Sequence, residues 1–172
     1  QNLAILIDCA DALGDQPHIL LLVAGGGVQR EALESEAKKR GLKNIRFLGR
    51  VERAEMKKIY GVSDVGLILY KKDDVFSNVL PAKLFDMWSA GLPIIINLAG
   101  EAGKLIEDSQ SGLVTAASDP VALKNAILEM MRNQEARKEM GRKGRVFAEQ
   151  YFNREKIAEE FLRILFATEK HA

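Results

Sequence analysis

Apolar residues in this chain gather into short continuous runs, each followed by glycine or by polar residues. A short apolar run between turn residues is typical of a strand that is buried on both faces of a sheet. We therefore predict a strand over each run and expect the first of them, over residues 18–24, to be buried on both faces. The runs cover residues 18–24, 45–48, 65–70, 94–96 and 112–114.

Between these runs, apolar residues recur three or four positions apart, which is the spacing of a helix with one buried face. Strands that alternate with helices in this way form a parallel sheet covered on both sides. The predicted fold is a single Rossmann-like α/β domain over residues 1–172, with three αβα layers, a mainly parallel sheet and extra C-terminal helices. The predicted helices cover residues 3–13, 28–40, 53–61, 79–90, 100–108, 120–133, 134–150 and 154–168.

The composition agrees with one globular domain and excludes several other classes of protein. Of the 172 residues, 47% are hydrophobic, and the formal net charge is +1. A near-neutral charge gives no electrostatic reason to expect nucleic-acid binding. Cys9 is the one cysteine, which excludes a disulfide scaffold. The apolar runs are much shorter than the ~20 residues of a membrane-spanning helix.

The start of the chain bears on its origin and location. Gln1 leads directly into a helical pattern, so we interpret the chain as a piece excised from a longer protein. No signal-peptide pattern is present at this start. Together with the single cysteine, this predicts a cytoplasmic protein, with the inner face of the membrane as a further place of action.

The loops that follow the strands hold the candidate site, because ligands bind such sheets outside the carboxyl ends of the strands. Gly25 and Gly26 follow the first strand, where glycines allow a ligand to approach the backbone at a helix N-terminus. The spacing differs from GxGxxG, and no acidic residue follows at the expected place, which argues against NAD. A tight strand-to-helix turn is the alternative interpretation.

The second strand ends in another glycine turn, formed by Gly49, Arg50 and Val51. Arg50 could reach a phosphate, and the backbone of this turn could pair with a planar base. An ordinary turn with a solvated Arg50 is the alternative.

The strongest candidate is the loop that leads into the predicted helix at residues 79–90. A helix N-terminus offers unpaired N–H groups and a positive dipole end, which would stabilise a diphosphate. Lys83 and Asp86 are three positions apart and share a polar face, so Asp86 could accept hydrogen bonds from a ribose diol and Lys83 could attract phosphate. The alternative is a capped amphipathic helix with a surface Lys–Asp pair. The residues before Lys83 in this candidate are Ser77, Asn78, Val79 and Leu80.

Other catalytic and metal-binding patterns are missing from the sequence. It contains no HExxH, CxxC or GxSxG, so no metal site and no nucleophile elbow is expected. Residues 136–145 are rich in lysine and arginine. We interpret this stretch as a solvated helix face, with contact to an anionic membrane surface as the alternative.

Several segments, taken in order, resemble the C-terminal, donor-nucleotide-binding half of the GT-B retaining glycosyltransferases of family 4, the glycosyl transferases group 1. The resemblance covers nearly the whole chain. It implies transfer of a sugar from a nucleoside diphosphate sugar, with UDP favoured, to a glycan or lipid-linked acceptor in bacterial surface polysaccharide synthesis. It also implies that no metal or other cofactor is needed. The segments are LLLVAGGGVQREALESEAKKRGLKNIRFLGRV, YGVSDVGLIL, SNVLPAKLFDMWSAGLPIII, DSQSGLV and YFNREKIAEEFLRIL.

The resemblance also assigns roles to the candidate residues. The family commonly has two glutamates eight positions apart, and the matching positions here are Asn78 and Asp86. Asp86 keeps a carboxylate for the ribose, whereas Asn78 departs from the pattern and carries no charge for the sugar. By the same likeness, residues 77–80 line the diphosphate and sugar, Arg50 and Val51 lie near the base, and residues 25–26 face the cleft.

The resemblance finally implies what lies outside this chain. The first strand of this half with its basic pair, and the whole acceptor-binding N-terminal domain, would precede Gln1. The acceptor-side catalytic residues therefore have no counterpart here, and we expect the isolated chain to bind nucleotide weakly without turnover. The alternatives are a GT-B-like UDP-sugar epimerase and a non-catalytic α/β nucleotide-binding module.

Overall fold

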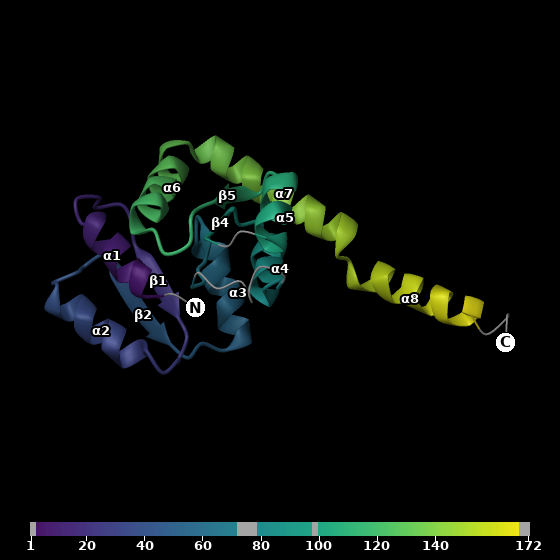
Figure 1. Cartoon of the computed structure of the whole chain (residues 1–172), viewed down its shortest axis with the longest axis horizontal. Coiled ribbons are helices and arrows are strands. Elements are labelled where there is room, and N and C mark those ends of the chain that lie inside the picture. Colours follow the sequence, from purple (N-terminus) through teal and green to yellow (C-terminus); the bar gives the residue numbers. More distant parts are fainter. Residues whose placement is uncertain (1–2, 72–78, 98–99, 169–172) are drawn as a thin grey trace.

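The computed structural model describes residues 3–71, 79–97 and 100–168, and within them strands and helices alternate as predicted (Figure 1). The strands are β1 (Leu21–Ala24), β2 (Ile45–Gly49), β3 (Gly66–Ile68), β4 (Ile94–Ile96) and β5 (Gly112–Val114). The helices are α1 (Ala4–Ala12), α2 (Arg30–Lys39), α3 (Arg53–Val62), α4 (Ala82–Ser89), α5 (Glu101–Asp108), α6 (Pro120–Arg132), α7 (Gln134–Tyr151) and α8 (Arg154–Thr168). The α/β fold class is confirmed.

The strands form two parallel sheets instead of the single predicted sheet. β1 pairs with β2, and β3, β4 and β5 pair in that order, with Leu21 opposite Ile45 and Leu67 opposite Ile95. No ladder joins β1 to β3 within the residues that the structure describes. The prediction of one continuous sheet was therefore wrong, because each sheet ends at an edge that pairs with no neighbouring strand.

The first strand also differs from its prediction. It spans four residues rather than residues 18–24, and Leu20 and Leu22 are 46% and 38% exposed. The expectation of burial on both faces was wrong, since the side chains at these alternate positions point away from the core that buries Leu21.

β4 lies between two hydrophobic clusters and is fully buried. Ile95 packs into a cluster formed by α1, α6, β1 and β2, which includes Leu13 and Leu123. Ile94 and Ile96 pack into a second cluster with residues of α4 and α5. Alternate residues of a strand face opposite sides of the sheet, so the strand predicted at 94–96 is buried on both faces.

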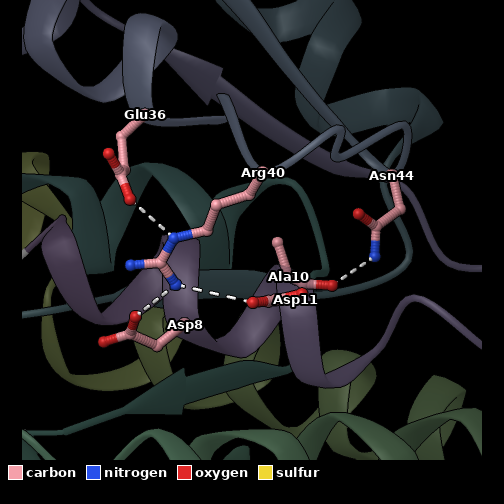
Figure 2. Close-up of polar contacts among 6 residues, drawn as sticks. All are labelled: Asp8, Ala10, Asp11, Glu36, Arg40 and Asn44. Atoms are coloured by element: carbon pink, nitrogen blue, oxygen red, sulfur yellow. Dashed lines mark hydrogen bonds and ion pairs between the residues drawn. The ribbon is translucent and has the colours of Figure 1, made fainter. Parts of the chain in front are cut away.

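Polar contacts join α1 to the segment that carries α2 and β2 (Figure 2). Arg40 follows α2 and donates to Glu36 at 2.7 Å and to Asp8 of α1 at 2.9 Å. Asn44, just before β2, donates its amide N–H to the carbonyl of Ala10 at 2.7 Å. Arg40 lowers the pKa of the Glu36 carboxyl by this hydrogen bond. These contacts hold α1 on the β1–β2 half of the molecule.

Helix α4 begins at Ala82, three residues later than predicted. Pro81 is its N-cap, with φ −71° and ψ 129°. Proline disfavours helical conformation in the residue before it, so the helix cannot continue back to residue 79.

The buried face of α4 is fixed from two sides. Trp88 is fully buried and donates its indole N–H to Ser111 at 2.8 Å. α7 packs across α4. A side chain on Gly144 of α7 would lie 2.7 Å from the Trp88 indole nitrogen. The absence of a side chain at this position therefore allows α7 to pack closely on α4 near Trp88.

The C-terminal helices extend the fold. Asp119 caps α6 by accepting from the backbone N–H groups of Val121 and Ala122 at 2.9 and 3.0 Å. α8 projects away from the body of the molecule (Figure 1). The basic residues 138, 142 and 145 are exposed and pair with glutamates one turn away on α7, as expected of a solvated face. Across the described ranges, no helix combines the length and the apolarity that crossing a membrane requires.

Candidate functional site

The glycine turns after β1 and β2 lie side by side. The backbone N–H of Gly25 donates to the carbonyl of Gly49 at 2.7 Å. Gly49 has φ +73°, a conformation that favours glycine. A Cβ on Gly26 would lie 3.5 Å from the Cβ of Arg50. The fold therefore brings together four of the predicted site residues at the carboxyl edge of β1 and β2.

Arg30 belongs to this group of residues, and the sequence analysis missed it. Its guanidinium lies over Gly49, because a Cβ there would meet the Arg30 Nη1 at 2.7 Å. Glu34, one turn later on α2, accepts from the Arg30 Nε at 2.7 Å and holds the side chain in place. An arginine three residues after the Gly25–Gly27 turn was the available signal, but its approach to Gly49 depends on the pairing of β1 with β2.

Arg50 and Val51 complete this turn. Arg50 is exposed, and the described part of the chain offers its guanidinium no hydrogen bond or ion pair. Val51 is half-buried. The turn after β2 thus exposes the Arg50 guanidinium and backbone groups to solvent at the carboxyl end of the strand.

Lys83 and Asp86 lie on the first turns of α4, in different environments. Lys83 is half-buried and lines a cavity of about 590 Å³ together with Tyr60 and Met87. Burial lowers the pKa of the Lys83 ammonium from its usual value. Asp86 is exposed. It faces Tyr60, whose pKa is raised by burial and then by the Asp86 charge. The two polar side chains therefore have different surroundings, a cavity for Lys83 and solvent for Asp86.

The alternative of a surface Lys–Asp pair is not what the structure shows. Among the described residues, no ion pair within 4 Å joins Lys83 to Asp86. Lys83 turns to the cavity, whereas Asp86 stays at the surface, so the charge of each is available to a ligand.

The residues before α4 are described in part. Val79 is 43% exposed, while Leu80 is half-buried and packs against the core around Trp88. The Leu80 side chain therefore packs in the core, and only the Leu80 backbone could contact a ligand. Ser77 and Asn78 lie outside the described residues.

Asn97 is a second residue that the sequence analysis missed. It is fully buried just after β4, and its side chain accepts from the N–H of Tyr70 at 2.6 Å and donates to the Tyr70 carbonyl at 3.1 Å. Both contacts tie the carboxyl end of β3 to β4 and so position the point where the next loop leaves the sheet. A polar residue directly after Ile94–Ile96 was the available signal.

The arrangement suits an anionic ligand with a polar ring system. The first backbone N–H groups of α4 have no partner within the helix, and such groups favour a phosphate. The helix carries a cation and a carboxylate, Lys83 and Asp86, and Arg50 adds a cation at the turn after β2. In the described ranges, no group of three or more His, Cys, Asp or Glu side chains is placed to hold a metal ion.

Comparisons with known proteins agree with this geometry. The family described as glycosyl transferases group 1 matches residues 1–147. The putative colanic acid biosynthesis glycosyl transferase WcaI of Escherichia coli is 27% identical over 169 residues, covering 94% of this chain and 39% of that protein. This chain spans less than half the length of the curated relatives that it matches.

Solved structures share the fold. Anabaena HepE, determined in complex with UDP, superimposes with a TM-score of 0.83 at 19% identity, covering 96% of this chain and 45% of that chain. The C-terminal domain of the group 1 glycosyl transferase LpcC of Francisella tularensis gives a TM-score of 0.73 at 18% identity, covering 87% of this chain and 78% of that domain.

Proposed function

This chain belongs to the glycosyl transferases group 1 family and has the fold of one half of a GT-B enzyme, and we propose that it is the donor-binding domain of a glycosyltransferase. Its donor is a nucleoside diphosphate sugar, with UDP as the nucleotide. Its parent protein transfers the sugar to a glycan or lipid-linked acceptor in bacterial surface polysaccharide synthesis. The observation that carries the proposal is the family match over residues 1–147. The UDP complex of HepE and the name of WcaI support the finer statements.

Each part of the candidate site has a role in this proposal. The first turn of α4, with the backbone at Val79 and Leu80, receives the diphosphate, and Lys83 adds positive charge beside it. Asp86 accepts hydrogen bonds from the ribose hydroxyls. The turn at Gly49–Val51 receives the base. Gly25 and Gly26 face the ligand with no side chain in its way.

The chemistry requires stabilisation of the leaving diphosphate. The bond between the anomeric carbon and the diphosphate oxygen breaks, and a bond from the same carbon to the acceptor oxygen forms, with retention of configuration. UDP leaves with the extra negative charge, and the acceptor hydroxyl loses its proton. We propose that backbone N–H groups, the helix dipole and lysine and arginine side chains stabilise that charge without a metal ion.

The parent protein needs a second, acceptor-binding domain, because the residues on this chain account for the donor side alone. We propose that this domain precedes the donor domain and that the parent works in the cytoplasm, at the inner face of the membrane where a lipid-linked acceptor is presented. The isolated donor domain is then expected to bind UDP without turning over a UDP-sugar.

The test is product analysis with the parent protein. Incubation with a UDP-sugar and a lipid-linked acceptor should release UDP and raise the acceptor mass by one sugar residue, as measured by mass spectrometry. A GT-B-like epimerase would instead yield a nucleotide sugar of unchanged mass and altered configuration. Binding of UDP with neither product would indicate a non-catalytic nucleotide-binding module. Sugar transfer catalysed by the isolated chain would contradict the proposal that a second, acceptor-binding domain is needed.

A further inference from the structure

The guanidinium of Arg30 covers the backbone of Gly49 at the end of β2. A Cβ on Gly49 would meet the Arg30 Nη1 at 2.7 Å and the Arg30 Cζ at 3.2 Å. Gly49 is buried although it lies at the carboxyl edge of the sheet, whereas the Arg30 side chain is 40% exposed. The guanidinium therefore shields the glycine and itself stays partly open to solvent.

Glu34 holds the Arg30 side chain in this position. It lies one turn later on α2 and accepts from the Arg30 Nε at 2.7 Å, and its own side chain is 26% exposed. The two terminal nitrogens of Arg30, Nη1 and Nη2, donate to no protein group in the part of the chain that the structure describes. An arginine held in this way loses less side-chain freedom when its remaining donors bind a ligand.

The free donors of Arg30 lie at the turn to which the base is assigned. Gly25 donates to the Gly49 carbonyl at 2.7 Å, and a Cβ on Gly26 would lie 3.5 Å from the Cβ of Arg50. Arg30 begins α2 after the first of these glycine turns, and its guanidinium reaches the second. Arg30 therefore connects the two turns at the carboxyl edge of β1 and β2.

A guanidinium offers donors and no acceptor, so it distinguishes the groups on the edge of a base. Uracil and guanine carry a carbonyl oxygen that can accept from the Nη groups. Cytosine and adenine carry an amino group at the corresponding position, whose N–H groups would face further N–H groups. We propose that Arg30, held by Glu34, is a specificity-determining residue that selects a base with a carbonyl acceptor over a base with an amino group. This inference rests on the proposed donor site.

UDP and CDP give the sharpest comparison, because uracil and cytosine have the same size and the two nucleotides share the ribose and the diphosphate. They differ at the ring edge, where uracil has a carbonyl oxygen and an N–H, and cytosine has an amino group and an unprotonated nitrogen. The ratio of the two Kd values therefore cancels contacts to the diphosphate and ribose, and it also cancels any change in the stability of the fold. The ratio reports contacts to the base edge.

The test is isothermal titration calorimetry of the 172-residue chain with UDP, CDP and inorganic diphosphate. The chain should bind UDP about tenfold more tightly than CDP, because half-exposed donors give only part of the discrimination that a fully buried base contact gives. Arg30→Met keeps an unbranched side chain but removes the donors, so UDP and CDP should then bind within about twofold of each other. The Kd for inorganic diphosphate should change by less than about twofold, since solvent and salt screen the lost charge.

Two further variants separate the base contact from charge and from structure. Arg46→Met removes an exposed arginine of β2, three residues before Gly49, and should leave the preference for UDP unchanged. Glu34→Gln keeps the shape of the side chain but loses the ion pair that holds Arg30, so the preference should fall to an intermediate value. A purely structural role of Arg30 would weaken the binding of UDP and CDP alike and leave their ratio unchanged.

The outcomes separate this inference from the proposed donor site. Binding of UDP without a preference over CDP in the original chain, or with the same preference in Arg30→Met, would overturn the role of Arg30 and leave the donor site in place. Equal losses of affinity for UDP, CDP and inorganic diphosphate in Arg30→Met would make Arg30 a phosphate contact and would also overturn that role. Failure of the original chain to bind any of the three ligands would overturn the proposed donor site and this inference with it.

Discussion

Asp86 combines an exposed carboxylate with a place on the helix that opens toward the candidate diphosphate site. The charge-assisted hydrogen bonds it would make to a ribose diol are each worth about 1.5–3 kcal/mol. Asp86→Asn should therefore raise the Kd for UDP by about 10- to 100-fold without lowering Tm, as measured by isothermal titration calorimetry. Asp15→Asn is the matched control, because Asp15 is exposed in the loop before β1, at the opposite end of that strand. An equal loss of UDP affinity in Asp86→Asn and Asp15→Asn would contradict the role of Asp86.

Lys83 predicts a pH dependence of binding. Burial lowers the pKa of its ammonium from 10.5, while a bound diphosphate favours the charged form and raises it. UDP affinity should therefore fall as the pH rises through the lowered pKa of the free protein, with proton uptake on binding. Calorimetry between pH 7 and the alkaline limit of stability measures this, and Lys83→Met supplies the baseline for titration of the ligand. If UDP affinity fell with pH equally steeply in Lys83→Met and in the original chain, Lys83 would not contact the diphosphate.

Cys9 predicts slow thiol chemistry. Burial raises the pKa of the Cys9 thiol from 9.0 to about 11. This difference leaves roughly one hundredth of the usual thiolate at pH 8. Alkylation by iodoacetamide in the folded protein should be at least about 100-fold slower than in urea, followed by mass spectrometry. The same shift means that Cys9 favours the folded state less as the pH rises from 9 toward 11. Alkylation at the rate of a free thiol would show that α1 opens readily.

The residues that the sequence analysis missed share one physical feature. Arg30 lies over Gly49, and Asn97 binds the backbone of Tyr70, across sequence separations that only strand pairing brings together. The turns at Gly25 and Gly49 could be predicted because a glycine directly after a strand is a local signal for a turn, and both glycines have positive φ.

Helix α7 packs closely on α4, the helix that carries Lys83 and Asp86. A methyl group on Gly144 would collide with the Trp88 ring. Gly144→Ala should therefore destabilise the fold by about 1–3 kcal/mol, measured by urea unfolding. Gly61→Ala on α3 is the matched control, because a Cβ there meets nothing within 4 Å, and alanine should stabilise that helix by about 0.5–1 kcal/mol. Stabilisation by both changes would show that α7 does not pack closely on Trp88.

A helix start could be predicted correctly where the residues at that start themselves mark it. The start of α6 could be predicted from Asp119 and Pro120, and the structure confirms both the cap and the proline at its first turn. The start of α4 was placed too early, because the apolar spacing that includes Leu80 continued upstream of Pro81 and was given more weight than the proline. The strands are shorter than their apolar runs because only the paired part forms a ladder.

For the molecule as a whole, the alternation of strands and helices was enough to predict the α/β class and the five strands found in the described ranges. It was not enough to predict the division into two sheets. A hydrophobic run indicates that a segment is buried, but it does not say which edges pair. β1 and β3 belong to different sheets and line opposite parts of the cavity that Lys83 also lines. The division therefore becomes visible only when the strand order is known.

We propose that this domain binds a nucleoside diphosphate at the carboxyl ends of its strands. The most direct test is a titration of the chain with UDP, GDP, ADP and NAD, followed by backbone amide chemical shifts. We expect UDP-selective shifts centred on residues 49–51 and 79–86, with smaller shifts at 25–26. Shifts caused by NAD alone and confined to residues 25–27, or no shifts with any of the four nucleotides, would contradict it.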